Sequence, residues 1–138
     1  MKATFLGTGC AMVLKRYNTC FLLEEDTSKL LVDAGGGSEI LIRLDKLGIP
    51  VTALGGMFVT HSHSDHILGT PWVIRAVATA MAEEGYTGTF TVAACQRTLS
   101  DIRTICEMIL GKKLTKFFDS QILFRQVTDG EALDLAVF

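Results

Sequence analysis

The three histidines of this protein lie within six residues, as His61, His63 and His66, and Asp65 lies among them. In an extended loop, residues two apart point the same way. His61 and His63 can therefore reach one metal ion, while a following turn directs Asp65 and His66 toward a second. Imidazole nitrogens and carboxylate oxygens are ligands that zinc accepts in catalytic sites, where three protein ligands usually leave one position for water. The spacing predicts half of a dinuclear zinc centre.

The chemistry of such a centre is hydrolysis. Two zinc ions roughly 3.5–4 Å apart can share a hydroxide and stabilise both the attacking and the leaving oxygen of an in-line displacement. The alternatives are a solvated loop that only forms hydrogen bonds, or an incidental His-x-His pair that binds metal weakly. The order of the ligand types favours the metal centre.

The elements that must position this cluster follow from apolar patterning. The cluster comes directly after residues 57–60, which we expect to be a short buried strand. Further strands are predicted at residues 3–6, 19–23, 30–33, 89–93, 121–127 and 132–138. The runs at 19–23 and 30–33 form a hairpin pattern and are almost continuously apolar, which is typical of strands covered on both faces.

Three helices are predicted from capping residues and helical periodicity. The first begins at the N-cap Ser38 and ends at Gly48, and the second begins at the N-cap Thr70, directly before a proline, and ends at Gly85. The third contains residues 99–109 and ends at a glycine. Their apolar stripes consist of Ile40, Leu41, Leu44 and Leu47; of Val73, Ile74, Val77 and Met81; and of Leu99, Ile102, Ile105, Cys106 and Ile109.

Strands alternate with helices after the opening hairpin, which favours an α/β architecture. A chain of 138 residues suits one domain, because cores form in units of about 100–150 residues. Residues 133–138 are mostly apolar, whereas termini usually lie in exposed, less apolar segments. We therefore expect residues 1–138 to be a single, incomplete domain.

Composition restricts the partners. The net charge is −2 and the pI about 5.9, which is atypical of nucleic-acid-binding domains. The basic cluster of Lys112, Lys113 and Lys116 is interpreted as a solvated helix end. No apolar run approaches the roughly 18 residues that span a bilayer, and the N-terminus lacks the apolar stretch of a signal peptide. We expect a cytoplasmic protein that does not enter a membrane.

The cysteines and glycines carry weaker predictions. The cysteines at positions 10, 20, 95 and 106 form no Cys-x-x-Cys pair, so all four are expected to be small buried residues. Residues 7–9, Gly-Thr-Gly, lack the rest of a phosphate-binding motif and predict a tight turn. The three glycines at 35–37 predict a flexible connector, with anion binding at the following helix as the alternative.

The segment Thr60-His61-Ser62-His63-Ser64-Asp65-His66 resembles the metallo-β-lactamase superfamily, whose hallmark is His-x-His-x-Asp-His after a buried strand. Residues 5–9, Phe-Leu-Gly-Thr-Gly, and residues 31–35, Leu-Val-Asp-Ala-Gly, are similar to the opening strands of its ribonuclease Z-like branch, which contains phosphodiesterases. The resemblance implies an αββα sandwich of which this chain supplies roughly the N-terminal half.

The resemblance also implies a role for each residue. His61 and His63 would bind the first zinc ion, Asp65 and His66 the second, and Asp65 would also orient or deprotonate the attacking water. The implied activity is zinc-dependent hydrolysis of a phosphodiester or related ester through a metal-bound hydroxide. Asp33 matches a family aspartate that fixes the tautomer of a ligand histidine. Equally, as a strand-end residue, it would cap the next loop.

The chain departs from the family because no histidine follows His66. The later half of the family fold supplies a third histidine for the first metal, a bridging aspartate and a final histidine. Three explanations are open: a fragment of a longer protein, completion by another chain such as a homo-oligomer, or a degenerate binding or assembly module without activity. The apolar surface of half a sandwich favours the first.

The substrate and the metal are separate questions. Ribonuclease Z proper carries Gly-Glu-x-Thr-Gln after its Asp-x-Gly, where residues 36–40 here read Gly-Gly-Ser-Glu-Ile. Together with the low pI, this disfavours transfer RNA and leaves a small-molecule or other phosphodiester substrate. Flavodiiron oxidoreductases of the superfamily place Glu at the position of His63. The imidazole at this position therefore favours zinc over iron as the bound metal.

Overall fold

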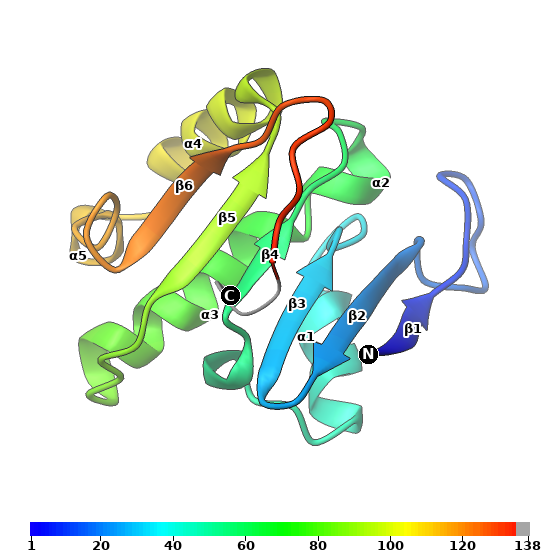
Figure 1. Ribbon diagram of the computed structural model, residues 1–138, viewed down its shortest axis with the longest axis horizontal. Coiled ribbons are helices and arrows are strands. Elements are labelled where there is room, and N and C mark those ends of the chain that lie inside the picture. Colours follow the sequence, from blue (N-terminus) through cyan, green and yellow to red (C-terminus); the bar gives the residue numbers. More distant parts are fainter. Residues whose placement is uncertain (135–138) are drawn as a thin grey trace.

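The computed structural model describes residues 1–134, which form a six-stranded sheet with helices on one face (Figure 1). The strands lie in the order β1-β2-β3-β4-β5-β6. The first two pairs are antiparallel and all later pairs are parallel. The strands are β1 (Lys2–Gly7), β2 (Cys20–Glu25), β3 (Ser28–Val32), β4 (Gly56–Phe58), β5 (Phe90–Ala94) and β6 (Ile122–Gln126).

The predicted helices are present as α1 (Glu39–Lys46), α3 (Thr70–Glu83) and α4 (Gln96–Ile109). Three short helical segments were not predicted, namely η1 (Val51–Ala53), α2 (Ser64–Ile67) and α5 (Lys112–Thr115). None of the helices within residues 1–134 has the length and apolarity needed to cross a membrane. The predicted strand at 132–138 is absent from residues 132–134, and its remaining residues lie outside the described part of the chain.

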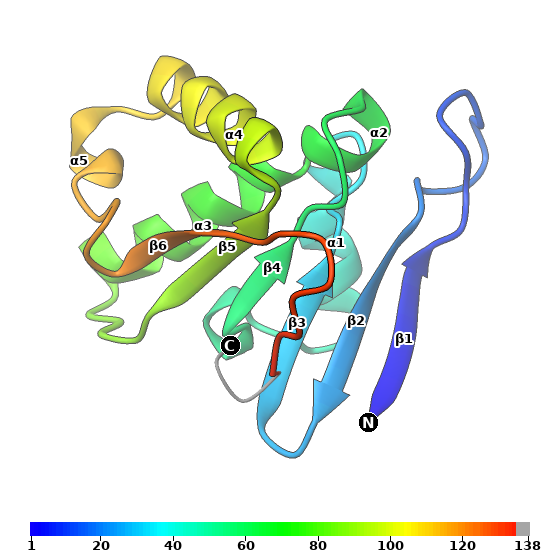
Figure 2. The ribbon, with the colours of Figure 1, turned by 45° about the horizontal axis from the view of Figure 1, so that its top comes forward.

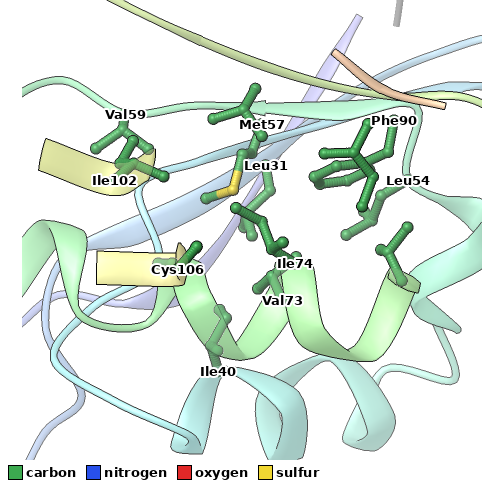
Figure 3. Close-up of a cluster of buried hydrophobic side chains, with 14 of the residues drawn as sticks. Leu31, Ile40, Leu54, Met57, Val59, Val73, Ile74, Phe90, Ile102 and Cys106 are labelled. Atoms are coloured by element: carbon green, nitrogen blue, oxygen red, sulfur yellow. The ribbon is translucent and has the colours of Figure 1, made fainter. Parts of the chain in front are cut away.

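The core lies between the sheet and the helices (Figure 3). Leu31 of β3 pairs with Met57 of β4, and both are fully buried on the face toward the helices. Ile40 of α1, Ile74 of α3 and Ile102 of α4 are also fully buried and close the core from the helix layer. Burial of each such side chain contributes about 1.5–3 kcal/mol, so these contacts fix the sheet and the helices as one unit.

The opposite face of the sheet is also apolar. Phe5 of β1 is 63% exposed and Leu123 of β6 is 38% exposed, while Phe21 and Phe58 are partly buried. The segment that follows β6 runs back across this face, away from the helices (Figures 1 and 2). The nearly continuous apolar runs of the sequence thus correspond to a sheet that carries apolar side chains on both faces.

Several sequence predictions about single residues were wrong. Leu47 and Ile109 are exposed, because α1 ends before Leu47 and Ile109 is the final residue of α4. Cys10 and Cys95 are exposed, since both lie in connections at the sheet edge, whereas Cys20 and Cys106 are buried as expected. Helical periodicity predicts a stripe but not how far a neighbouring element covers it.

The helix caps also differ in detail. Ser38 is the N-cap of α1 as predicted, but its side chain makes no capping hydrogen bond. Gly69, not Thr70, is the N-cap of α3, so the threonine lies inside the helix. Its hydroxyl is fully buried and has no hydrogen-bond partner within the described residues.

Candidate metal centre

The histidine cluster lies at the edge of the sheet where parallel strands end. β3, β4 and β5 run in the same direction, so the segments after their last residues meet at one edge (Figure 2). His61 and His63 follow β4 in an irregular loop, and Asp65 and His66 belong to α2. The ring centroid of His61 lies 4.5 Å from that of His63 and 4.2 Å from that of His66. The three imidazoles that the sequence places close together therefore also gather in space.

Asp33 connects β3 to this cluster. It follows the last residue of β3, has a left-handed backbone with φ of 55°, and is 4% exposed. Its Oδ2 lies 2.7 Å from Nδ1 of His66, and its Oδ1 accepts a hydrogen bond of 2.8 Å from the backbone N–H of Thr60. The sequence left open whether Asp33 orients a histidine or caps the next loop. Its side chain bonds to His66 and to the loop after β4, and within residues 1–134 it makes no hydrogen bond to the loop that follows β3.

Thr60 extends this network to a second histidine, a role that the sequence did not reveal. Its Oγ1 lies 2.8 Å from Oδ2 of Asp33 and 2.9 Å from Nδ1 of His61. Because the Asp33 carboxylate can only accept, the threonine hydroxyl donates to it and His61 Nδ1–H donates to the hydroxyl. His66 Nδ1–H donates directly to Asp33 by the same reasoning. In their neutral form, both imidazoles then keep Nε2 as a free acceptor, which is the tautomer that a metal ligand needs.

Asp65 supplies a test of whether these residues suit a metal. Its Oδ2 lies 3.4 Å from Nε2 of His66. With the His66 Nδ1 proton held by Asp33, a carboxylate oxygen and an unprotonated nitrogen face one another, and two acceptors repel unless a cation or proton lies between them. The donor types and their orientation therefore fit a zinc ion.

The donor set is nevertheless incomplete. Within residues 1–134, no group of three or more His, Cys, Asp or Glu side chains is arranged to hold a metal ion. The four cluster residues would provide two ligands to each of two metals, whereas catalytic zinc sites usually have three from the protein. Within residues 1–134, the cluster thus offers fewer ligands than a catalytic zinc site usually has.

Glycines bring the supporting loops close together. A Cβ on Gly69 would lie 1.8 Å from the carbonyl oxygen of Ala34, so only glycine permits this approach. The backbone N–H of Gly69 donates to the Gly35 carbonyl oxygen at 2.8 Å. The backbone N–H of Ala34 donates to the His66 carbonyl oxygen at 3.1 Å. These bonds hold the segment bearing Asp33 against the segment bearing His66.

Tyr17 holds the glycine loop at residues 35–37. Its hydroxyl is shared between the carbonyl oxygens of Ala34, at 2.7 Å, and Gly37, at 2.9 Å, and burial raises its pKa to about 12. The N–H of Gly36 donates to the Asn18 side chain at 3.1 Å, so that amide is already bonded and the anion-binding alternative loses support. The loop is a connector as predicted, but one fixed by side chains.

Residues 7–9 differ from the predicted tight turn. A Cβ on Gly7 would lie 2.2 Å from the Asn18 carbonyl oxygen, and one on Gly9 would lie 2.9 Å from that of Tyr17. Neither glycine has a left-handed backbone. Both glycines are therefore required by close backbone contact with residues 17–19, which is a tertiary constraint.

Comparison with known proteins identifies relatives by sequence. A family model described as Anti-Pycsar protein Apyc1 matches residues 1–126. Ribonuclease Z of Haloferax volcanii is 42% identical over 78 residues, which are 56% of this chain and 24% of that protein. The Anti-Pycsar protein Apyc1 of Bacillus phage 010DV004 is 40% identical over 70 residues, which are 50% of this chain and 26% of that protein.

Solved structures confirm the fold. The metallo-β-lactamase fold protein YhfI of Bacillus subtilis superposes with a TM-score of 0.69 and 18% identity, covering 96% of this chain and 48% of that one. The short form of human tRNase Z superposes with a TM-score of 0.64 and 23% identity, covering 78% of this chain and 39% of that one. The chain therefore has the predicted metallo-β-lactamase fold, and it covers less than half of each of these relatives.

Proposed function

Because this chain belongs to the family described as Anti-Pycsar protein Apyc1, we propose that it supplies the histidine-bearing half of a zinc-dependent phosphodiesterase. The observation that carries the proposal is the hydrogen-bond network around Asp33. It holds His61 and His66 in the tautomer that leaves Nε2 free, and it places that nitrogen of His66 beside the Asp65 carboxylate. A loop without a metal would have no need for two imidazoles oriented in this way.

Each residue would then have a defined task. His61 and His63 would bind one zinc ion, and Asp65 and His66 the other. Bound zinc lowers the pKa of water and polarises a phosphoryl oxygen. The Asp65 carboxylate would orient the attacking water and accept its proton, since its Oδ2 is directed into the cluster. Asp33 and Thr60 would hold the imidazoles against rotation.

The charge of the chain favours a small phosphodiester over a polynucleotide. The net charge is −2, without the excess of basic residues typical of domains that follow a nucleic-acid backbone, and the densest basic stretch of the sequence is the cluster of Lys112, Lys113 and Lys116. That cluster is also partly neutralised, since Lys113 pairs with Glu83 at 2.6 Å. Two of the compared proteins, ribonuclease Z of Haloferax volcanii and the short form of human tRNase Z, carry RNA in their names, so RNA belongs in the substrate panel as the competing outcome.

Metal analysis combined with turnover tests the proposal. Purified protein is loaded with zinc, and the bound metal and the hydrolysis of bis(p-nitrophenyl) phosphate, a 3′,5′-cyclic nucleotide and a structured RNA are measured. We expect His63→Ala to lose metal and turnover. Ser64→Ala is the matched control, because Ser64 is adjacent and exposed and makes no side-chain hydrogen bond within residues 1–134. Equal turnover in the His63 variant and wild type would refute the proposal.

A binding or assembly module without activity is the second candidate. It is favoured by the absence, within residues 1–134, of any group of three metal-binding side chains. This module would bind substoichiometric zinc and show the same thermal melting with and without a chelator. The phosphodiesterase requires further ligands from a longer chain or a second chain, so full metal occupancy in an oligomer would distinguish it from the module.

A further inference from the structure

Ser62 lies between two ligand histidines and is anchored from outside the cluster. Its Oγ donates a hydrogen bond of 2.6 Å to Oδ2 of Asp101, in the middle of α4, and lies 3.2 Å from Oγ1 of Thr98. A hydroxyl–carboxylate bond of this length lies in the range of charge-assisted hydrogen bonds, which are about twice as strong as neutral ones. Thr98 is 2% exposed, so the anchor point belongs to the rigid part of the helix.

This bond acts on a loop that has no regular secondary structure. The last ladder contact before the cluster is the bond of 2.9 Å from the Val59 N–H to the Ala93 carbonyl oxygen, and α2 begins at Ser64. The carbonyl oxygen of His63 accepts from the N–H groups of His66 and Ile67 at 2.9 Å, so residues 60–62 are the part of the loop that depends on side-chain bonds. Thr60 is tied to Asp33 after β3, and Ser62 is tied to α4, which follows β5.

The alternation of side chains gives the Ser62 tie its consequence. In an extended segment, residues 61 and 63 project to the side opposite residue 62. Anchoring Ser62 to α4 therefore directs the His61 and His63 imidazoles away from α4, where their ring centroids lie 4.5 Å apart. The tie through Thr60 fixes the His61 ring directly, whereas the exposed imidazole of His63 has no hydrogen bond within residues 1–134.

We propose that Asp101 is a positioning residue for the metal centre, which acts through Ser62 to set the placement of His63 relative to His61. The inference rests on the proposed function, because it matters only where the two imidazoles share a metal. Asp101 itself is not a ligand, since its Oδ2 is bonded to Ser62. Metal sites need their ligands within about 0.5 Å of the productive geometry, so an anchor one residue away controls affinity.

The test compares the two serines that flank His63. Ser62→Ala and Asp101→Ala remove the anchor, Ser64→Ala is the matched control in the same loop, and Ser62→Thr retains the hydroxyl. Binding of Co²⁺ by the full chain is followed by visible absorption, and urea unfolding confirms that each variant is folded. We expect the first two variants to weaken Co²⁺ binding by about tenfold or more and to change the ligand-field bands. Ser64→Ala and Ser62→Thr should resemble wild type.

A second readout is independent of metal. In the metal-free chain, the imidazole NMR signals of His63 should shift and broaden in Ser62→Ala and Asp101→Ala, and those of His61 and His66, which Thr60 and Asp33 hold, should change less. Unchanged ring signals and unchanged Co²⁺ affinity in folded variants would overturn the role of Asp101 and leave the proposed function intact. If wild type binds no Co²⁺ either as a monomer or as an oligomer, this chain does not hold the metal by itself, and the ring signals still decide whether Asp101 positions the loop.

Discussion

Replacing Asp33 by asparagine should disable the histidine cluster while leaving the fold in place. The position has a φ of 55°, and asparagine tolerates the left-handed region nearly as well as aspartate, so the substitution adds little backbone strain. The amide keeps one oxygen for the Thr60 N–H but presents an NH₂ group where Oδ2 now accepts from His66 and Thr60. An acceptor is exchanged for a donor at the point where two donors arrive.

The magnitude follows from these two bonds. Hydrogen bonds to a charged group contribute about 1.5–3 kcal/mol each. Part of this loss is recovered if His66 changes tautomer, since the new amide N–H can donate to Nδ1 and the displaced proton on Nε2 can bond to Asp65, 3.4 Å away. We expect a net loss of about 2–3 kcal/mol in the free energy of unfolding. Because Nε2 is then protonated, zinc affinity should fall by about 10–100-fold.

Urea unfolding measures the stability change, competition with a chromophoric chelator measures zinc affinity, and ¹⁵N NMR identifies which ring nitrogen of His66 carries the proton. Asp26→Asn is the matched control. Asp26 has the same charge and a left-handed φ of 51°, but it is exposed in the β2–β3 hairpin and has no side-chain partner within residues 1–134. The reasoning is refuted if Asp33→Asn keeps wild-type zinc affinity with His66 still protonated at Nδ1.

Three further perturbations test the supporting structure. Gly69→Ala should lower the unfolding free energy by about 3 kcal/mol, the upper range for overpacking, because its Cβ meets the rigid Ala34 backbone; urea titration measures this. Tyr17→Phe should cost about 1–3 kcal/mol by leaving two loop carbonyls unpaired. The pKa of Tyr17 is raised to about 12 in the folded protein. The contribution of its hydroxyl to the free energy of unfolding is therefore complete below pH 10 and is lost as the pH rises toward 12. Melting curves of the phenylalanine variant should lack this decline. Hydrogen bonds from the Thr98 side chain and backbone lower the pKa of Cys95, so its alkylation, located by mass spectrometry, should begin at lower pH than in Thr98→Val.

The strand and helix pattern was largely predictable because it depends on local periodicity. The apolar stripe of α3 is buried at all four predicted positions, since this helix is covered along its length by the sheet. The predictions for Leu47 and Ile109 failed at helix ends, where burial depends on whether another element extends that far. Residues 132–134 were assigned to a strand from their pattern, but no neighbouring strand pairs with them.

The sequence by itself determined the cluster of His61, His63, Asp65 and His66, because these residues lie so close along the chain that any compact loop brings them together. Only the tertiary structure decided how these side chains are held. Asp33 lies 33 residues before its partner His66, and Asp101 lies 39 residues after its partner Ser62. The segments that carry these residues meet because β3, β4 and β5 are parallel. Such contacts have no characteristic spacing in a sequence, since they depend on the order of strands in the sheet. The sequence therefore reveals the candidate ligands, and the fold reveals the residues that hydrogen-bond to the cluster.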